Sequence, residues 1–300
     1  MTTTTTATVE ADLIRIIGGI DNLPTPPIVM QQIQKVLNDP AASAYDIGSI
    51  LQEDPAMSAR VLKLTNSAYY GLVRTIESVR QAVVIVGLDS IRSLVLSASV
   101  FEAFSGKDLD RELQEHFWRH SLAAAFGARL IAHSLTSRQT FDAEAGFSGG
   151  LLHDIGKMVI TFYMPEPAQD IKQLKIDFPN LPDHELEDRV LGYNHTQIGA
   201  VLGERWKLPA NLIETIRYHH APRLTPTKEN GLPYLVHTAN HLATFTFDYD
   251  AEADTYLEPL HEGALEFIGG NEHDLPVLSQ RLREEYSRAE TFMEMARGGH

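Results

Sequence analysis

The sequence predicts an all-α protein built from many short helices. Apolar residues recur at the three- and four-residue spacing of an amphipathic helix, as in Ile33, Val36 and Leu37. Strict alternation of apolar and polar residues, which would indicate strands, is scarce. Signals for the start of a helix recur along the whole chain, so about thirteen to fifteen helices would fit its length.

The expected helices begin at recognisable cap residues. Ser43 is followed three residues later by Asp46, which is the arrangement of a capping box, and Asp54 precedes a proline in the first helical position. Further start signals, in chain order, are Thr25 before Pro26-Pro27, then Pro165, Pro182, Pro209 and Leu275-Pro276. These signals place helix starts in every part of the chain.

One apolar run is short enough to be a strand or a buried helix. Residues 83–86 read Val-Val-Ile-Val and end at Gly87. We interpret the run as a helix, and we expect Asp89 to cap the next helix, residues 91–104.

The chain divides into four predicted parts. They are a disordered polar tail (1–12), an N-terminal helical part (13–105), a helical core (106–222) and C-terminal helices that complete the core and dock on the body (223–300). An apolar stripe in the last part would pack on the body, and a homodimer contact is the alternative. The stripe consists of Val277, Leu278, Leu282, Tyr286, Ala289 and Phe292.

Composition excludes several classes of function. The chain has 25 basic and 40 acidic residues, and its net charge of -15 repels polyphosphate backbones and anionic membranes, so no broad nucleic-acid binding is expected. No run reaches the roughly 18 apolar residues of a membrane helix, and the polar start does not resemble a signal peptide. We therefore expect a cytoplasmic protein. Because there is no cysteine, any metal site must use imidazole and carboxylate ligands.

The strongest local signal is His153-Asp154, which lies among glycine and apolar residues. A neighbouring imidazole and carboxylate offer a cation one neutral nitrogen and one charged oxygen, and the carboxylate can bridge two ions. Lys157, one turn later, is placed to contact a phosphate. The equally weighted alternative is a buried pair that is satisfied by hydrogen bonds.

Other histidines are candidate ligands because of their positions. A site with several ligands must draw them from different helices. Ten of the 13 histidines lie between His116 and His241. His120 belongs to one expected helix, His195 opens another, and His219-His220 close a third. Taken singly, each is more typical of a core or helix-end histidine than of a ligand.

The order His120, His153-Asp154, His195, His219-His220 resembles the ligand series of the HD superfamily of metal-dependent phosphohydrolases. Other segments are similar to the HDOD family, the HD-related output domains of bacterial signalling proteins. They are LPTPP at 23–27, DPAMSARVLKLTNSAYYG at 54–71, FWRHS at 117–121, GLLHDIGK at 150–157 and WKLP at 206–209. The resemblance spans residues 15 to 222.

This resemblance implies an HD-domain-like multi-helix bundle with an N-terminal helical subdomain. It implies that His120, His153 and Asp154 hold one divalent ion, and that Asp154 bridges to a second ion held by three histidines, which are His195, His219 and His220. Imidazole and carboxylate together suit Fe, Mn, Zn and Ni alike. It also implies a signalling partner, such as a response regulator, a kinase or a cyclic-dinucleotide protein.

One position departs from the pattern of active HD enzymes. Their closing ligand is an aspartate, and the matching segment here carries Asn240. A neutral amide keeps one coordinating oxygen but removes a full negative charge, so metal binding should weaken and water activation should suffer more.

We therefore expect a regulatory protein that binds a partner or a small nucleotide without efficient catalysis. The alternatives are a weak metal-dependent phosphohydrolase acting on nucleotides or phosphodiesters, and a structural adaptor with an empty site. Cyclic di-GMP hydrolysis is not supported. The paired histidines are followed by Ala221-Pro222, and Gly192-Tyr193 is followed by Asn194, where HD-GYP enzymes have an acidic residue and a Gly-Tyr-Pro motif.

Overall fold

Helices dominate the computed structural model, which describes residues 13–20, 23–25, 28–37, 43–105, 110–135, 140–249 and 256–298. Within these ranges there is no strand, so the all-α prediction is confirmed. The predicted tail, 1–12, lies outside them. Sixteen labelled α-helices, α2 to α17, exceed the predicted number, because very short helices such as the four-residue α15 leave no periodic pattern in the sequence.

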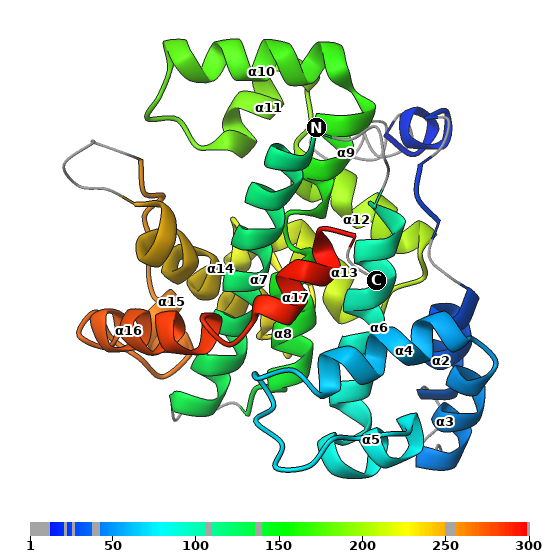
Figure 1. Ribbon diagram of the computed structural model, residues 1–300. Coiled ribbons are helices and arrows are strands. Elements are labelled where there is room, and N and C mark those ends of the chain that lie inside the picture. The colour runs from blue at the N-terminus through cyan, green and yellow to red at the C-terminus, as the bar shows by residue number, and fades with distance from the viewer. Residues whose placement is uncertain are drawn as a thin grey trace.

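The N-terminal helices form one side of the molecule, at the lower right of Figure 1. Two of their predicted caps are confirmed. Ser43 and Asp46 form a capping box, and the side chain of Asp54 accepts from the backbone N–H of Met57. The helices are α2 (Ile28–Leu37), α3 (Ala44–Gln52), α4 (Pro55–Thr65), α5 (Val79–Val86) and α6 (Leu88–Ala103).

The run at 83–86 is helical, as predicted, but the predicted cap Asp89 is wrong. Gly87 has a φ of 90°, a conformation that favours glycine, and it turns the chain directly from α5 into α6. Helix α6 therefore begins at Leu88, and Asp89 lies in its first turn.

A central group of helices surrounds the long helix α7, which runs through the middle of Figure 1. Pro165 occupies the first helical position of α10, and Pro182 and Pro209 immediately precede α11 and α13, as their start signals predict. The group comprises α7 (Arg111–Ser134), α8 (Ala143–Leu152), α9 (Ile155–Tyr163), α10 (Pro165–Asp177), α11 (Asp183–Leu191), α12 (His195–Arg205), α13 (Ala210–Tyr218), the 3-10 turn η1 (Pro222–Leu224), α14 (Leu232–Ala243) and the π-helical turn η2 (Thr244–Asp248).

Two glycines set the close packing of this group. A Cβ on Gly150 would lie 2.7 Å from the backbone of Ala124 in α7, and a Cβ on Gly156 would lie 2.0 Å from the carbonyl oxygen of His195. Neither position has room for a side chain. The absence of side chains therefore brings α8 against α7 and α9 against α12, and both contacts adjoin the His153-Asp154 pair.

The C-terminal helices are α15 (Ala264–Phe267), α16 (Asp274–Tyr286) and α17 (Glu290–Ala296). Leu278, Leu282 and Phe292 of the predicted stripe are buried in the main core, whereas Val277 is 60% exposed and does not dock. Helix α17 packs on α4, α6 and α7 (Figure 1). The C-terminal segment thus closes over the N-terminal part, while the homodimer and the four-part division of the chain stay predictions.

Across the described ranges, no helix combines the length and the apolar character that crossing a membrane requires.

Candidate metal centre

The His153-Asp154 pair lies at the junction between α8 and α9. His153 directly follows the last residue of α8, and Asp154 directly precedes α9, but the Asp154 carboxylate makes no capping hydrogen bond to that helix. Both side chains are almost completely buried. The carboxylate is therefore free to face a group of histidines instead of the helix end.

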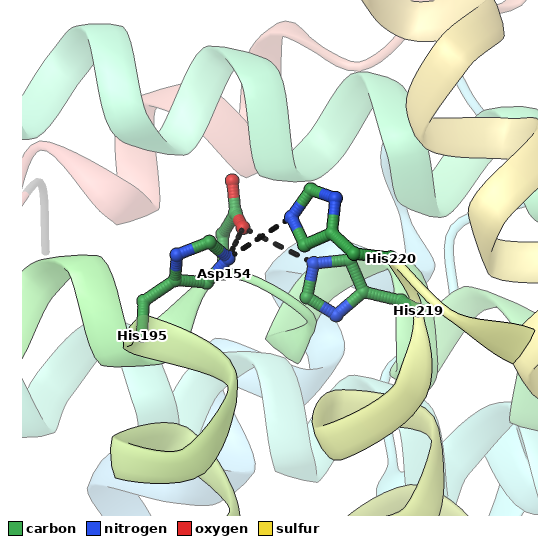
Figure 2. A group of neighbouring side chains, drawn as sticks. All are labelled: Asp154, His195, His219 and His220. Carbon is green, nitrogen blue, oxygen red and sulfur yellow. Dashed lines mark hydrogen bonds and ion pairs between the residues drawn. The ribbon is translucent and has the colours of Figure 1, made fainter. Parts of the chain in front are cut away.

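One carboxylate oxygen faces two histidines from two other helix ends, and a third histidine lies beside them (Figure 2). Oδ1 of Asp154 lies 3.1 Å from Nε2 of His195 and 3.6 Å from Nε2 of His219. Nε2 of His220 lies 3.2 Å from Nε2 of His195. Asp154 and these three histidines offer four ligand atoms within 4.8 Å of one another, which is a spacing that a metal ion can draw together.

The other carboxylate oxygen faces a second group. Oδ2 of Asp154 lies 3.4 Å from Nε2 of His153 and 3.8 Å from Nε2 of His120, which comes from α7. The same nitrogen of His120 lies 3.0 Å from Oδ1 of Asn240 in α14. All seven predicted metal-site residues therefore meet around one carboxylate, whose two oxygens face different groups.

The ring nitrogens that point away from the centre are held by hydrogen bonds. Nδ1 of His153 lies 2.7 Å from the carbonyl oxygen of Gly150, and Nδ1 of His219 lies 2.9 Å from that of Ile216. Nδ1 of His195 lies 2.6 Å from the carboxylate of Glu187. Since oxygen can only accept here, each Nδ1 carries the proton and each Nε2 faces inward, as in histidines that bind metal through Nε2.

Three buried atoms at the centre lack a hydrogen bond of acceptable geometry among the described residues. They are Nε2 of His153, Nε2 of His219 and Oδ1 of Asp154. Buried polar atoms normally find a partner, because desolvation without one is costly. Two imidazole nitrogens and a carboxylate oxygen that converge without a well-formed hydrogen bond fit a divalent cation.

The charges at the centre also suit a cation. Burial lowers the pKa values of His153 and His219, so these rings are neutral at pH 7. Burial opposes ionisation of Asp154, but His153, Lys157 and His195 outweigh it and hold its pKa well below the usual range. Burial likewise opposes the charge of His195, but Glu187 and Asp154 raise its pKa to about 9. A cation at His195 would have to displace a proton.

Lys157 is engaged by carboxylates. Its Nζ lies 2.9 Å from Oδ2 of Asp154 and 3.4 Å from Oδ2 of Asp183. Burial opposes its charge, but these two carboxylates raise its pKa. The predicted phosphate contact therefore stays a prediction, and it would require Lys157 to exchange at least one of these partners.

A cavity of about 350 Å³ opens onto the centre. Asp154, His120, His220, Asn240 and Lys157 line it together with aromatic residues from α7 and α9. A pocket of this size that combines apolar walls with a few polar groups is typical of a site for a small molecule.

Sequence reasoning missed three residues around the centre. Oδ2 of Asp248 lies 3.3 Å from Nδ1 of His120, and a Glu258 oxygen lies 2.9 Å from Nδ1 of His220. The ring of His184 packs at a tilt against that of His220, with 4.2 Å between centroids. Asp248 is the last residue of the π-helical turn, a feature that the sequence does not reveal. In the sequence, only the acidic and aromatic residues that follow Asp248 point to this segment.

The histidines that flank Asn240 do not join the predicted ligands. Nδ1 of His237 lies 2.7 Å from the carbonyl oxygen of His219, and its Nε2 accepts from the backbone N–H of His261. Nδ1 of His241 lies 2.9 Å from the carbonyl oxygen of Glu258. Both rings therefore form hydrogen bonds with backbone groups beside the centre.

Comparison with known proteins identifies a matching family and a similar protein. A family model described as the HDOD domain matches residues 23–222. An uncharacterized protein of Treponema pallidum (strain Nichols) is 28% identical over 277 residues, which make up 92% of this chain and 52% of that protein. The chain thus spans about half the length of that relative.

Two solved structures are similar over nearly their whole length. One is a Shewanella amazonensis SB2B protein described provisionally as a phosphohydrolase, with 25% identity, a TM-score of 0.71 and coverage of 94% of this chain and 96% of that one. The other is an HDOD domain protein of unknown function from Geobacter sulfurreducens, with 25% identity, a TM-score of 0.69 and coverage of 97% of each chain. The predicted HD-domain-like bundle is confirmed.

Proposed function

The chain belongs to the HDOD domain family, and we propose that it is a bacterial signal-transduction protein whose buried centre holds one or two divalent cations. In this proposal the cations and the adjoining cavity bind a small phosphorylated ligand, such as a nucleotide. The ligand-bound protein then interacts with a signalling partner. It does so without efficient catalysis. The donor set suits Fe, Mn, Zn or Ni, and the expected compartment is the cytoplasm.

The observation that carries this proposal is the contact between Asn240 and His120. Oδ1 of Asn240 lies 3.0 Å from the His120 nitrogen that faces the Asp154 carboxylate. A neutral amide therefore occupies a place where a carboxylate would add a charge and accept a proton from water. Ligand binding needs only positive charge and space, so it tolerates the amide better than hydrolysis does.

The cavity supports a small ligand over a polymer. Its volume of about 350 Å³ accommodates a molecule of mononucleotide size, and its walls include the apolar and aromatic side chains of Leu113, Phe117, Phe162 and Tyr256. A phosphate in the cavity would meet Lys157 beside Asp154. The bound cations would supply the remaining positive charge for that phosphate.

A weak phosphohydrolase activity is the second candidate, because Asp154 itself lines the cavity. In that case Lys157 would hold the phosphate, and Asp248 would fix the orientation of His120. The resemblance to the Shewanella protein supports the same chemistry.

Metal content and turnover separate these functions. The purified protein, reconstituted with Fe, Mn, Zn or Ni, should bind one or two ions more than Asp154→Ala and should bind a nucleotide with little hydrolysis. Turnover of a generic phosphodiester that is lost in Asp154→Ala would make the hydrolase the better account. Equal metal content in both proteins would contradict the proposed centre.

A further inference from the structure

A second cluster of ligand-type side chains lies on the outer side of His220. It consists of His184, His220 and Glu258, and we call it the outer cluster. A Glu258 oxygen lies 2.9 Å from Nδ1 of His220, which is the nitrogen that points away from His195. The predicted ligand series contains neither His184 nor Glu258, so this cluster is additional to the centre described above.

Within the outer cluster, His184 gives the evidence for a bound ligand. Its ring packs at a tilt against the ring of His220, with 4.2 Å between centroids and 32° between planes. Its Nδ1 is buried and makes no hydrogen bond within the described ranges of the chain. If Glu258 served only to orient His220, as Glu187 orients His195, this unpaired nitrogen would remain unexplained.

We propose that the outer cluster is a third cation site, which takes up a divalent metal ion from the cavity. Two imidazoles and one carboxylate form a donor set that suits Zn²⁺, Co²⁺, Ni²⁺ or Fe²⁺ and does not suit Mg²⁺ or Ca²⁺, which prefer oxygen. The three ligand atoms lie within 4.8 Å of one another. Ligands around a tetrahedral zinc ion are about 3.4 Å apart, so modest side-chain rotation would complete the site.

The position of the outer cluster supports uptake of ions. Glu258 and His220 both line the cavity, and the side chain of Glu258 is 29% exposed, whereas that of Asp154 is 3% exposed. A cation that enters through the cavity would thus meet the outer cluster near the entrance to the buried centre. His220 connects the two sites, since Nδ1 faces Glu258 and Nε2 faces His195. With both sites filled, His220 would bridge the two ions as an imidazolate, and its remaining N–H proton would be released to solvent.

Counting bound Co²⁺ tests this proposal. Equilibrium dialysis against CoCl₂ would compare the wild type with His184→Phe, which keeps an aromatic ring against His220 but removes the ligand. The expected result is one Co²⁺ fewer per chain in His184→Phe. His273→Phe, which changes an exposed histidine, is the control and should bind as many ions as the wild type. Equal Co²⁺ binding by His184→Phe and the wild type would overturn the outer site.

A second comparison separates this proposal from the proposed function. Asp154→Ala removes the bridging carboxylate of the inner centre but leaves the outer cluster intact. It should retain one Co²⁺ per chain, and adding His184→Phe or Glu258→Gln should remove that ion. If Asp154→Ala binds as many ions as the wild type, the inner centre fails while the His184 comparison still stands. If Asp154→Ala folds, by circular dichroism, and binds no Co²⁺, the outer site is wrong.

Discussion

Oδ1 of Asn240 lies 3.0 Å from Nε2 of His120, the nitrogen that also faces the Asp154 carboxylate at 3.8 Å. The position that the resemblance gives to the closing ligand is therefore in contact with His120. An amide at this place lowers the negative charge that a cation would meet. The effect of that charge on metal affinity can be measured directly.

Restoring the carboxylate should strengthen metal binding. Asn240→Asp adds a negative charge beside His120, and we expect the affinity for Zn²⁺ or Mn²⁺ to rise by about tenfold to a hundredfold, the range found when groups around a metal are altered. Isothermal titration would measure the change. Asn211→Asp adds the same charge at an exposed position and should have no such effect. An unchanged affinity in Asn240→Asp would mean that the amide oxygen does not take part in the centre.

The carboxylate of Glu187 should be needed to hold His195. It accepts from both the backbone N–H and Nδ1 of His195, at 2.7 and 2.6 Å. Glu187→Gln removes the charge, so metal affinity should fall by about tenfold to a hundredfold. Glu185→Gln, an exposed change on the same helix, is the matched control. If the two variants bind metal equally well, His195 does not depend on Glu187.

Side chains at the close helix contacts should destabilise the fold. Gly150→Ala would place a Cβ 2.7 Å from the backbone of Ala124, so we expect a loss of about 1–3 kcal/mol in the free energy of unfolding. Gly18→Ala has nothing within 4 Å of its Cβ and should be neutral or slightly stabilising. Urea unfolding would compare the two. A Gly150→Ala variant as stable as the wild type would show that α7 and α8 can separate at little cost.

Removing metal should lower thermal stability. An ion that binds only the folded chain stabilises it by about 2.7 kcal/mol at a concentration of 100 times its Kd. A chelator should therefore lower the Tm of the wild type, and added Zn²⁺ or Mn²⁺ should restore it. The Tm of an Asp154→Ala, His184→Phe double variant should respond to neither treatment. A Tm of the wild type that is insensitive to chelator and to metal would argue against bound cations.

The sequence predicted the fold better than the surroundings of the centre. The Ser43 and Asp54 caps are local features, and local patterns were sufficient to find them. The cap at Asp89 was wrong because Gly87 turns the chain without a capping side chain. The failure of Val277 to dock reflects the rotation of α16 on the body, which apolar spacing alone does not determine.

The predicted ligands lie at helix ends that the sequence marks, whereas their partners depend on tertiary structure. His195 follows a cap at Asn194, and His219 directly follows α13, so spacing could find both. Asp248 and Asn240 are eight residues apart, which on an unbroken α-helix would separate them by about 80° around the axis. The π-helical turn alters that relation. His184 and Glu258 meet His220 from segments far away in the chain.

The central claim is that Asp154 is the bridging ligand of a cation centre, and metal analysis tests it most directly. Elemental analysis after reconstitution would compare His184→Phe, in which the outer site is removed, with the same protein carrying Asp154→Ala. We predict one or two divalent ions per chain in the first and none in the second, with His153→Ala also reduced. Equal metal content in the first two proteins, or no metal in either, would contradict the account.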